Sequence, residues 1–304
     1  MTLAMLHSPS SVALAQRIQW LALEFRVPED WEIARHGVRF ESGSLVFVDR
    51  ARQRLSVSWT ECPRTPDLER LFSDFEARPH ADGERSRNQR DYADFRVCER
   101  SRKSGQATTH ALKYEPRSKR LIELEFAHGD AAGERAFVEE LLSAFVFVER
   151  GQGSHFRAFS VHAALPRGFE LCASDVKPAD VSFEFARVAE RNERRVCIRR
   201  SGMARSWFDG DVSRALRQRN PELLFEKLEQ IDFGCHGASS GLASTRGAPL
   251  ERLFKRSAPV RVTSWHCPAE NALFELTEPS EIADRERCQL WCCADAEEGR
   301  GREH

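Results

Sequence analysis

Thiol and imidazole side chains are concentrated in the last third of the chain. The set consists of Cys235, His236, His266, Cys267, Cys288, Cys292 and Cys293. Thiolate and imidazole are the ligands that zinc prefers, and Cys288 and Cys292 would share one face if their segment were a helix. The candidate ligands are His266, Cys267, Cys288 and Cys292. No C-x-x-C pair occurs, and free cysteine is commonly a small buried apolar residue. We therefore predict no cofactor and keep zinc as the alternative.

Two possible nucleophiles stand in the same region. The pentapeptide GASSG at 237–241 fits the G-x-S-x-G pattern with Ser239 as nucleophile. That motif needs a strand before it, a helix after it and a parallel sheet around it, and glycine and proline interrupt the residues that follow. Cys235 could act with His266 as a thiol nucleophile, although nothing in the sequence brings them together. We predict no catalytic residue, and a metal- or thiol-dependent enzyme is the alternative.

Two stretches are rich in arginine. Residues 84–103 carry seven basic and four acidic side chains, and residues 187–200 carry six and two. With Tyr92 and Phe95 nearby, such arginines could contact phosphates while the rings stack on bases. The formal net charge of the chain is −1, however, which is unlike that of most nucleic-acid-binding modules. Nucleic acid is therefore an alternative partner rather than the predicted one.

The segment 201–219 places aromatic and arginine side chains close together. Trp207 and Phe208 are adjacent, Asp211 can cap a short helix, and Arg214 and Arg217 follow within that helix. Tryptophan and arginine are enriched among the residues that dominate protein–protein binding. We predict that Trp207, Phe208, Arg214 and Arg217 bind a protein partner. The alternative is that the segment packs on its own domain and buries Trp207.

Three phrases occur twice in the same order. VPEDWEI at 27–33 matches LPRGFEL at 165–171, TPDL at 65–68 matches NPEL at 220–223, and YEPRSKRLIEL at 114–124 matches HCPAENALFEL at 266–276. Repeated phrases in a constant order indicate an internal duplication. We predict a first repeat over 12–150 and a second over 151–304, the second lengthened by an insertion near 201–219.

The hydrophobic pattern predicts the elements of one repeat. Alternation predicts a hairpin that turns at 50–53 and strands at 94–99, 107–114 and 120–126, while helical spacing predicts helices at 66–77 and 134–145. Residues 78–91 are predicted as a polar loop, Asn220 as a helix N-cap, and 285–294 as a short helix. The predicted fold is α+β, with two tandem repeats that each pair an antiparallel sheet with two helices.

This order of strands, helix, strands and helix resembles that of the PsbP-like and DcrB-like fold group. The resemblance covers most of each repeat and rests on element order, since no diagnostic motif of the group is present. It implies an accessory or assembly factor rather than an enzyme, and it carries no functional residue over to this chain.

The remaining features concern location and class of function. No stretch approaches the roughly 20 apolar residues of a membrane span, and the first residues lack the positive charge of an export signal. The nine cysteines then favour free thiols in a reducing compartment. We predict a bacterial, cytoplasmic protein that does not bind membranes and acts as a non-catalytic interaction or assembly factor.

Overall fold

The structure is a computed structural model that divides into two compact units, Met1–Arg150 and Gly151–His304. It describes residues 14–76, 84–102, 107–128, 131–148, 155–187, 194–245, 258–282 and 287–293. None of the helices in these residues has the length and apolar character that a membrane crossing requires.

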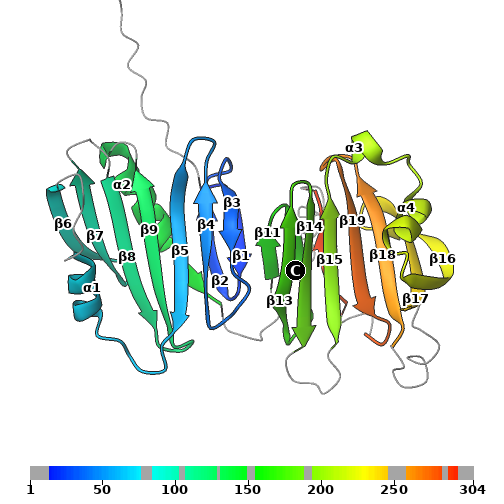
Figure 1. The fold of residues 1–304 in the computed structure, drawn as a ribbon, viewed down its shortest axis with the longest axis horizontal. Helices are drawn as coiled ribbons and strands as arrows, with labels where there is room; N and C mark the ends of the chain where they lie inside the picture. Colours follow the sequence, from blue (N-terminus) through cyan, green and yellow to red (C-terminus); the bar gives the residue numbers. More distant parts are fainter. Residues whose placement is uncertain are drawn as a thin grey trace, which may run out of the picture. The chain divides into compact units, whose positions relative to one another are not determined.

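The first unit is built on an antiparallel sheet of seven strands in the order β3-β4-β5-β9-β8-β7-β6 (Figure 1). The strands are β3 (Glu32–His36), β4 (Ser42–Val48), β5 (Gln53–Glu61), β6 (Glu84–Tyr92), β7 (Phe95–Arg102), β8 (Ala107–Glu115) and β9 (Arg120–His128). A three-stranded layer consists of β1 (Gln16–Trp20), β2 (Leu23–Val27) and β10 (Val146–Phe147). Helix α1 (Leu68–Glu76) connects β5 to β6, and α2 (Ala131–Ser143) connects β9 to β10.

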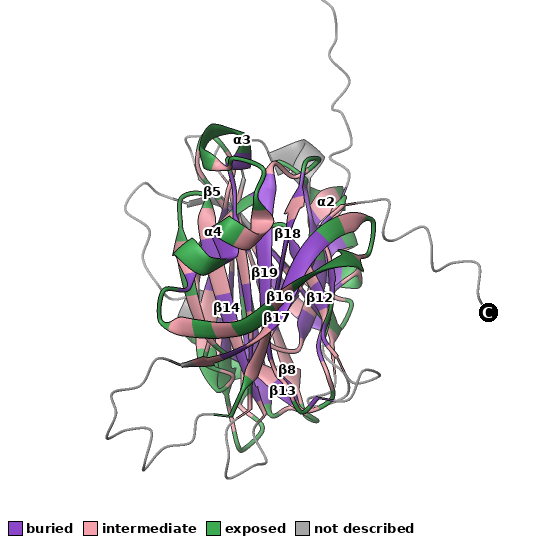
Figure 2. Ribbon diagram, turned by 90° about the vertical axis from the view of Figure 1, so that its right-hand side faces the viewer, coloured by how far each residue is buried: buried purple, intermediate pink, exposed green. Residues whose placement is uncertain are grey.

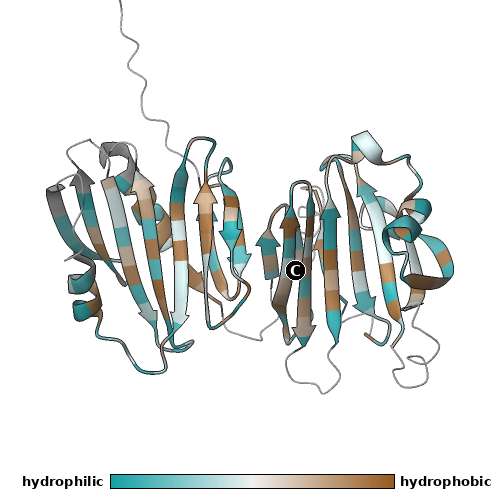
Figure 3. Ribbon diagram, in the orientation of Figure 1, coloured by the Kyte–Doolittle hydropathy of each residue, from teal (hydrophilic) through white to brown (hydrophobic). Residues whose placement is uncertain are grey.

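Alternating side chains form the core of this unit. Leu45 and Phe47 of β4 are fully buried while the residues between and beside them are not, and β5 repeats the pattern with Leu55, Val57 and Trp59. Successive residues of a strand point to opposite faces of the sheet. The same alternation of apolar and polar residues is visible along the strands in Figure 3.

The two helices of the first unit cover opposite faces of the sheet. Phe72 of α1 packs with Cys98 of β7 and with Leu112. Phe145, just after α2, stacks on Phe25 of β2 at 5.2 Å between ring centroids and contacts Phe95 of β7 at 5.7 Å. Phe95 and Cys98 are three residues apart, so their side chains point to opposite faces.

The second unit has the same strand order. Its seven-stranded sheet runs β13-β14-β15-β19-β18-β17-β16. The strands are β13 (Phe169–Lys177), β14 (Asp180–Arg187), β15 (Arg195–Ser201), β16 (Leu223–Phe233), β17 (His236–Thr245), β18 (Val260–Cys267) and β19 (Ala272–Pro279). A three-stranded layer consists of β11 (His155–Ala158), β12 (Val161–Ala164) and β20 (Gln289–Trp291). Between β15 and β16, where the first unit has α1, lie α3 (Ala204–Trp207) and α4 (Val212–Arg219).

Helix α4 and the three-stranded layer cover opposite faces of this second sheet. Leu216 of α4 packs with Ala243 and Val262. On the other face, Phe156 of β11 lies 4.7 Å from Phe183 of β14, measured between ring centroids. Figure 2 shows that α4 has a buried inner side and an exposed outer side. The outer side of α4 is therefore available to solvent.

The predicted α+β fold with two helices in each repeat is wrong. Both units consist mainly of strands, and in the described residues of the second unit the only helices are α3 and α4, which occupy a single connection. Strands make up most of each unit because short strands, in addition to the large sheet, complete the second layer. The resemblance to the PsbP-like and DcrB-like group stays a prediction.

Three local predictions are also wrong. Of the segment 78–91 predicted as a polar loop, residues 84–91 belong to β6 at the edge of the sheet, and residues 78–83 lie outside the described residues. The sequence of β6 has no apolar alternation that would identify it as a strand. Asn220 is the C-cap of α4 rather than an N-cap, and its side-chain amide donates to the Leu216 carbonyl at 3.0 Å. The predicted C-terminal helix contains strand β20 instead, so Cys288 and Cys292 do not lie one helical turn apart.

We predict that Gly241→Ala lowers the stability of the second unit by about 2 kcal/mol, a usual cost of overpacking. A bulge between Phe225 and Lys227 brings the Lys227 carbonyl against Gly241, and an added methyl group would lie 2.8 Å from Cδ2 of Leu228. The matched control is Gly237→Ala, because nothing lies within 4 Å of that position. Equal melting temperatures for the two variants in thermal unfolding would contradict this packing.

Candidate functional site

Four thiol and imidazole groups meet on one face of the second sheet. The possible ligand atoms of His236, Cys267, Cys292 and Cys293 all lie within 4.8 Å of one another. His236 begins β17, Cys267 ends β18, and the other two directly follow β20. We call these four residues the Cys/His cluster.

Strand pairing explains why these residues meet. Ala238 of β17 pairs with Trp265 of β18, and continuing this antiparallel register by two residues places His236 opposite Cys267. Strand β20 is held by β12 through the pairing of Ala163 with Leu290. The cluster therefore joins both layers of the second unit.

The interior of the Cys/His cluster is closely packed. His236 Nε2 lies 3.0 Å from Cys292 Sγ and 3.7 Å from Cys293 Sγ. The indole N–H of Trp265 donates to Cys292 Sγ at 3.4 Å. Cys267 is completely buried, whereas Cys235, whose Sγ lies 3.6 Å from Cys293 Sγ, is exposed. The cluster thus has a closed inner side and one additional thiol at its rim.

Burial sets the protonation of these groups when no metal is bound. Burial lowers the pKa of the His236 imidazole, and the nearby His266 lowers it further. Burial raises the pKa of the Cys293 thiol to about 11 and also raises the pKa of Cys292. At neutral pH the His236 imidazole is therefore neutral, and the thiols of Cys292 and Cys293 keep their protons.

Two of the four sequence-predicted ligands, Cys267 and Cys292, belong to the cluster, and two do not. His266 points to the opposite face of the sheet, where its ring centroid lies 4.9 Å from that of Phe208. Cys288 is four residues from Cys292, about 13 Å along an extended strand, and its backbone N–H donates to Glu278 Oε1 at 2.8 Å.

Sequence reasoning missed His236 and Cys293 as members. The assumed helix at 285–294 hid the place of Cys293, and nothing local links His236 to residues more than fifty positions away. The useful signal was the strand alternation of Trp265 and Cys267. That alternation places the side chains of Cys267 and His266 on opposite faces of the sheet. Because Cys235 lies beside the cluster, on the side of Cys267, it is also separated from His266.

Ser239 does not stand on a nucleophile elbow. GASSG lies inside β17, in an antiparallel sheet, and Ser239 is completely buried. Its hydroxyl lies 2.7 Å from the Ser213 hydroxyl and accepts a hydrogen bond from the Gln230 amide at 2.9 Å. These contacts fix α4 to the sheet, so the serine has a structural role.

The predicted partner-binding residues lie on α3 and α4. Trp207 is 44% exposed, although its indole N–H donates to the Gly202 carbonyl at 2.9 Å and the Arg219 guanidinium lies 5.6 Å from its ring centroid. Phe208 is half-buried against His266. Met203, which precedes α3, is 61% exposed. Trp207 and Met203 therefore face solvent, whereas Phe208 belongs to the packing beneath them.

The outer side of α4 carries arginines. Asp211 caps the helix, as predicted, by accepting the Arg214 backbone N–H at 2.9 Å. The Arg214 guanidinium forms an ion pair with Asp209 at 2.8 Å. Arg217 is exposed and has no ion pair with any described residue. Part of the positive charge of this helix is therefore left unbalanced at the surface.

A charged network fixes the end of α4 to the sheet. Asp180 accepts hydrogen bonds from Arg199 at 2.8 Å and from Ser201 at 2.5 Å, and Arg219 contacts both Asp180 and Ser201. Burial alone would raise the pKa of Asp180, but these hydrogen bonds and the charges of Arg199 and Arg219 lower it to about 2. Since Arg219 also lies over Trp207, the network positions the exposed indole.

Several arginines of the two Arg-rich stretches form ion pairs within the chain. In the first stretch, Arg90 pairs with Glu139 at 2.5 Å and with Glu99 at 2.8 Å. In the second, Arg195 pairs with Glu184 at 2.8 Å, and residues 188–193 lie outside the described residues. These arginines thus lie against carboxylates, an arrangement that does not favour contact with a phosphate backbone.

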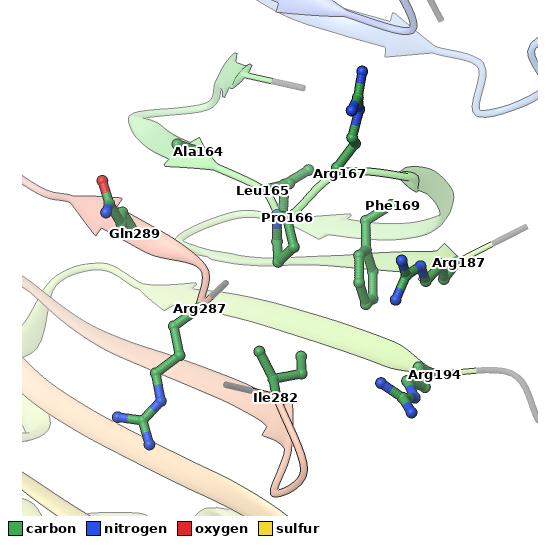
Figure 4. A pocket seen from close by; sticks show the side chains of 10 residues that line it. All are labelled: Ala164, Leu165, Pro166, Arg167, Phe169, Arg187, Arg194, Ile282, Arg287 and Gln289. Carbon is green, nitrogen blue, oxygen red and sulfur yellow. The ribbon is translucent and has the colours of Figure 1, made fainter. Parts of the chain in front are cut away.

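A pocket of about 360 Å³ opens elsewhere on the second unit (Figure 4). Its lining residues are Ala164, Leu165, Pro166, Arg167, Phe169, Arg187, Arg194, Ile282, Arg287 and Gln289. Arg194 pairs with Glu281 at 3.7 Å, and Arg187 and Arg287 also interact within the chain. The described lining residues include no carboxylate, thiol or imidazole.

Comparison with known proteins does not establish a family. No family model and no curated protein matches the sequence. Among solved structures, the chain is similar to the apo structure of immunity protein TplEi of the T6SS from Pseudomonas aeruginosa, at 10% identity over 89% of this chain and 92% of that one, with a TM-score of 0.35. A structure of TplEi complexed with "L" peptide gives 12% identity, 90% and 94% coverage, and a TM-score of 0.31. Scores this low do not establish a common fold.

We predict that Asp180→Asn destabilises the second unit by about 1 kcal/mol at neutral pH, a modest value because solvent reaches a third of the side chain. The folded-state pKa lies below the usual value near 3.9, so the stabilisation is complete above about pH 5 and is lost as the pH falls toward 2. Thermal unfolding of wild type and variant across this range measures it.

The control for this experiment is Asp175→Asn, since Asp175 pairs only with the exposed Lys177 among the described residues. We expect it to leave the melting temperature nearly unchanged. A difference between wild type and Asp180→Asn that stays constant from pH 7 to about pH 2 would contradict a pH-dependent role for this network.

Proposed function

We propose that this chain is a non-catalytic protein-binding factor whose second unit binds an acidic partner protein. The binding surface consists of Met203, Arg205, Trp207, Arg214 and Arg217, and we call it the α3–α4 surface. The observation that carries the proposal is Trp207, which is fixed in place and yet exposed to solvent.

A fixed, exposed tryptophan is suited to binding. The hydrogen bond to Gly202 and the Arg219 guanidinium hold the indole in one orientation. A side chain that is already ordered loses little conformational entropy when a partner covers it. Large aromatic rings also supply much of the apolar area at binding hot spots. Trp207 therefore has both the chemistry and the rigidity of an interface anchor.

Met203 supports the same assignment. Its φ of 56° lies in the left-handed region, which disfavours residues with a Cβ atom, and its side chain is exposed beside α3. Together with Trp207, Met203 gives this end of the sheet an apolar surface that no described residue covers.

The charge around these residues indicates an acidic partner. Arg205 and Arg217 are exposed and form no ion pair with the described residues. Arg214 forms ion pairs with both Asp209 and Asp211. The α3–α4 surface thus has three arginines and only two neighbouring carboxylates around its apolar centre. This excess of positive charge favours a partner that presents carboxylates.

A non-catalytic role agrees with the two nucleophile candidates. Ser239 is buried and bonded within the sheet, and Cys235 and His266 lie on different faces. We place the protein in a reducing compartment such as the bacterial cytoplasm, because its nine cysteines form no disulfide.

We predict that Trp207→Ala abolishes binding of the acidic partner while the fold stays intact. The immobilised full chain is incubated with lysate of the native host, retained proteins are identified by mass spectrometry, and the affinity of the purified partner is then measured. We expect at least about a 30-fold loss of affinity, as for hot-spot tryptophans. Arg217→Glu should weaken binding, and added salt should weaken it further.

The matched control is Val146→Ala, which removes another exposed apolar side chain, one that lies in the first unit and is 49% exposed. It should retain the same partner with unchanged affinity. The proposal fails if every retained protein survives Trp207→Ala, if the dependent partner is basic, or if nuclease treatment removes the binding. Phe208→Ala is unsuitable as a test because Phe208 packs on His266.

A further inference from the structure

We propose that His236, Cys267, Cys292 and Cys293 bind one zinc ion that links both layers of the second unit. The proposal is independent of the α3–α4 surface, because the Cys/His cluster lies on the other face of the sheet. It assigns these cysteines a role that apolar packing alone does not explain.

The spacing of the ligand atoms fits tetrahedral coordination. Zinc–sulfur bonds of about 2.3 Å and zinc–nitrogen bonds of about 2.0 Å place neighbouring ligand atoms of such a set roughly 3.5–3.8 Å apart. All four atoms lie within 4.8 Å of one another, and the measured separations from His236 Nε2 include 3.0 Å to Cys292 Sγ and 3.7 Å to Cys293 Sγ. Adjustments of side-chain rotamers by less than about 1 Å would complete the site.

The donor atoms select zinc among the common metal ions. Three sulfurs and one imidazole nitrogen make up the set, and it contains no carboxylate. Calcium and magnesium require oxygen ligands, whereas soft thiolates with imidazole in a tetrahedral arrangement favour zinc. A set of four protein ligands also leaves no open position for a substrate, which is the mark of a structural rather than a catalytic zinc site.

The surroundings of the cluster suit a bound ion. The Trp265 indole N–H points at Cys292 Sγ, and such outer hydrogen bonds orient and stabilise metal-bound thiolates. The Trp265 ring stacks on Phe233 at 4.3 Å and on Phe274 at 5.6 Å between centroids. Trp265, which is completely buried in this stack, is the member that contacts the cluster.

The consequence of zinc binding is a cross-link between distant segments. The ligands come from the start of β17, the end of β18 and the residues after β20. Strand β20 has three residues and pairs with β12 alone among the described strands. A metal ion bound only by the folded chain adds its binding free energy to folding, so zinc would stabilise the attachment of this short strand.

The full chain is tested by metal analysis after reductive purification, incubation with zinc and removal of unbound metal. We expect about one equivalent of zinc in the wild type and loss of most of it in His236→Ala, Cys292→Ser and Cys293→Ser. Cys288→Ser and Cys172→Ser are the matched controls and should keep it, because neither residue belongs to the cluster. Chelation should lower the melting temperature by more than about 5 °C.

Cobalt binding provides a readout that does not depend on the variants folding. Wild-type protein titrated with Co²⁺ should develop sulfur-to-cobalt charge-transfer absorption and the intense visible bands of a tetrahedral site, saturating at one equivalent. Less than about a tenth of an equivalent of zinc, or cobalt spectra typical of octahedral oxygen ligation, would overturn the proposal. Loss of zinc in Cys288→Ser or Cys172→Ser, with retention in Cys293→Ser, would show that the ligand set is wrong.

Discussion

The pairing register of β17 with β18 is the constraint on which the second unit depends. With Ala238 opposite Trp265, even-numbered residues of β17 share a face with odd-numbered residues of β18. His236 and Cys267 therefore meet on one face, while Ser239 and His266 lie on the other. A shift of one residue would exchange the two faces. The Cys/His cluster would then be separated, and the contacts that hold α4 would be lost.

We propose different tasks for the two faces of this sheet because different elements cover them. On one face, Asn220 links α4 to β19 by donating to the buried Glu275 at 2.9 Å, and burial raises the pKa of that carboxyl despite the hydrogen bond. Firm attachment of α4 leaves its outer side and Trp207 free for a partner. On the other face, the three-stranded layer brings β20 against the large sheet and delivers two cysteines to His236 and Cys267. The proposed partner surface and the proposed zinc site can thus coexist without sharing a residue.

Sequence patterns predicted features that local chemistry determines. The phrases at 114–124 and 266–276 form corresponding hairpins, in which Glu115 pairs with Arg120 and Cys267 with Ala272. Asp211 caps α4 as its position before a short amphipathic segment indicated. Patterns failed where tertiary pairing decides the structure, since short apolar runs such as the one around β20 suit either a strand or a helix. For the same reason the sequence predicted only two of the four cluster residues, because only the fold brings His236 near Cys293.

The most direct test of this account is zinc K-edge X-ray absorption on the zinc-loaded full chain. If the β17–β18 register and the placement of β20 are as described, the first shell must contain three sulfurs at about 2.3 Å and one nitrogen at about 2.0 Å. A shell of oxygen and nitrogen alone, or one of four sulfurs without imidazole, would contradict the arrangement on which the zinc site rests.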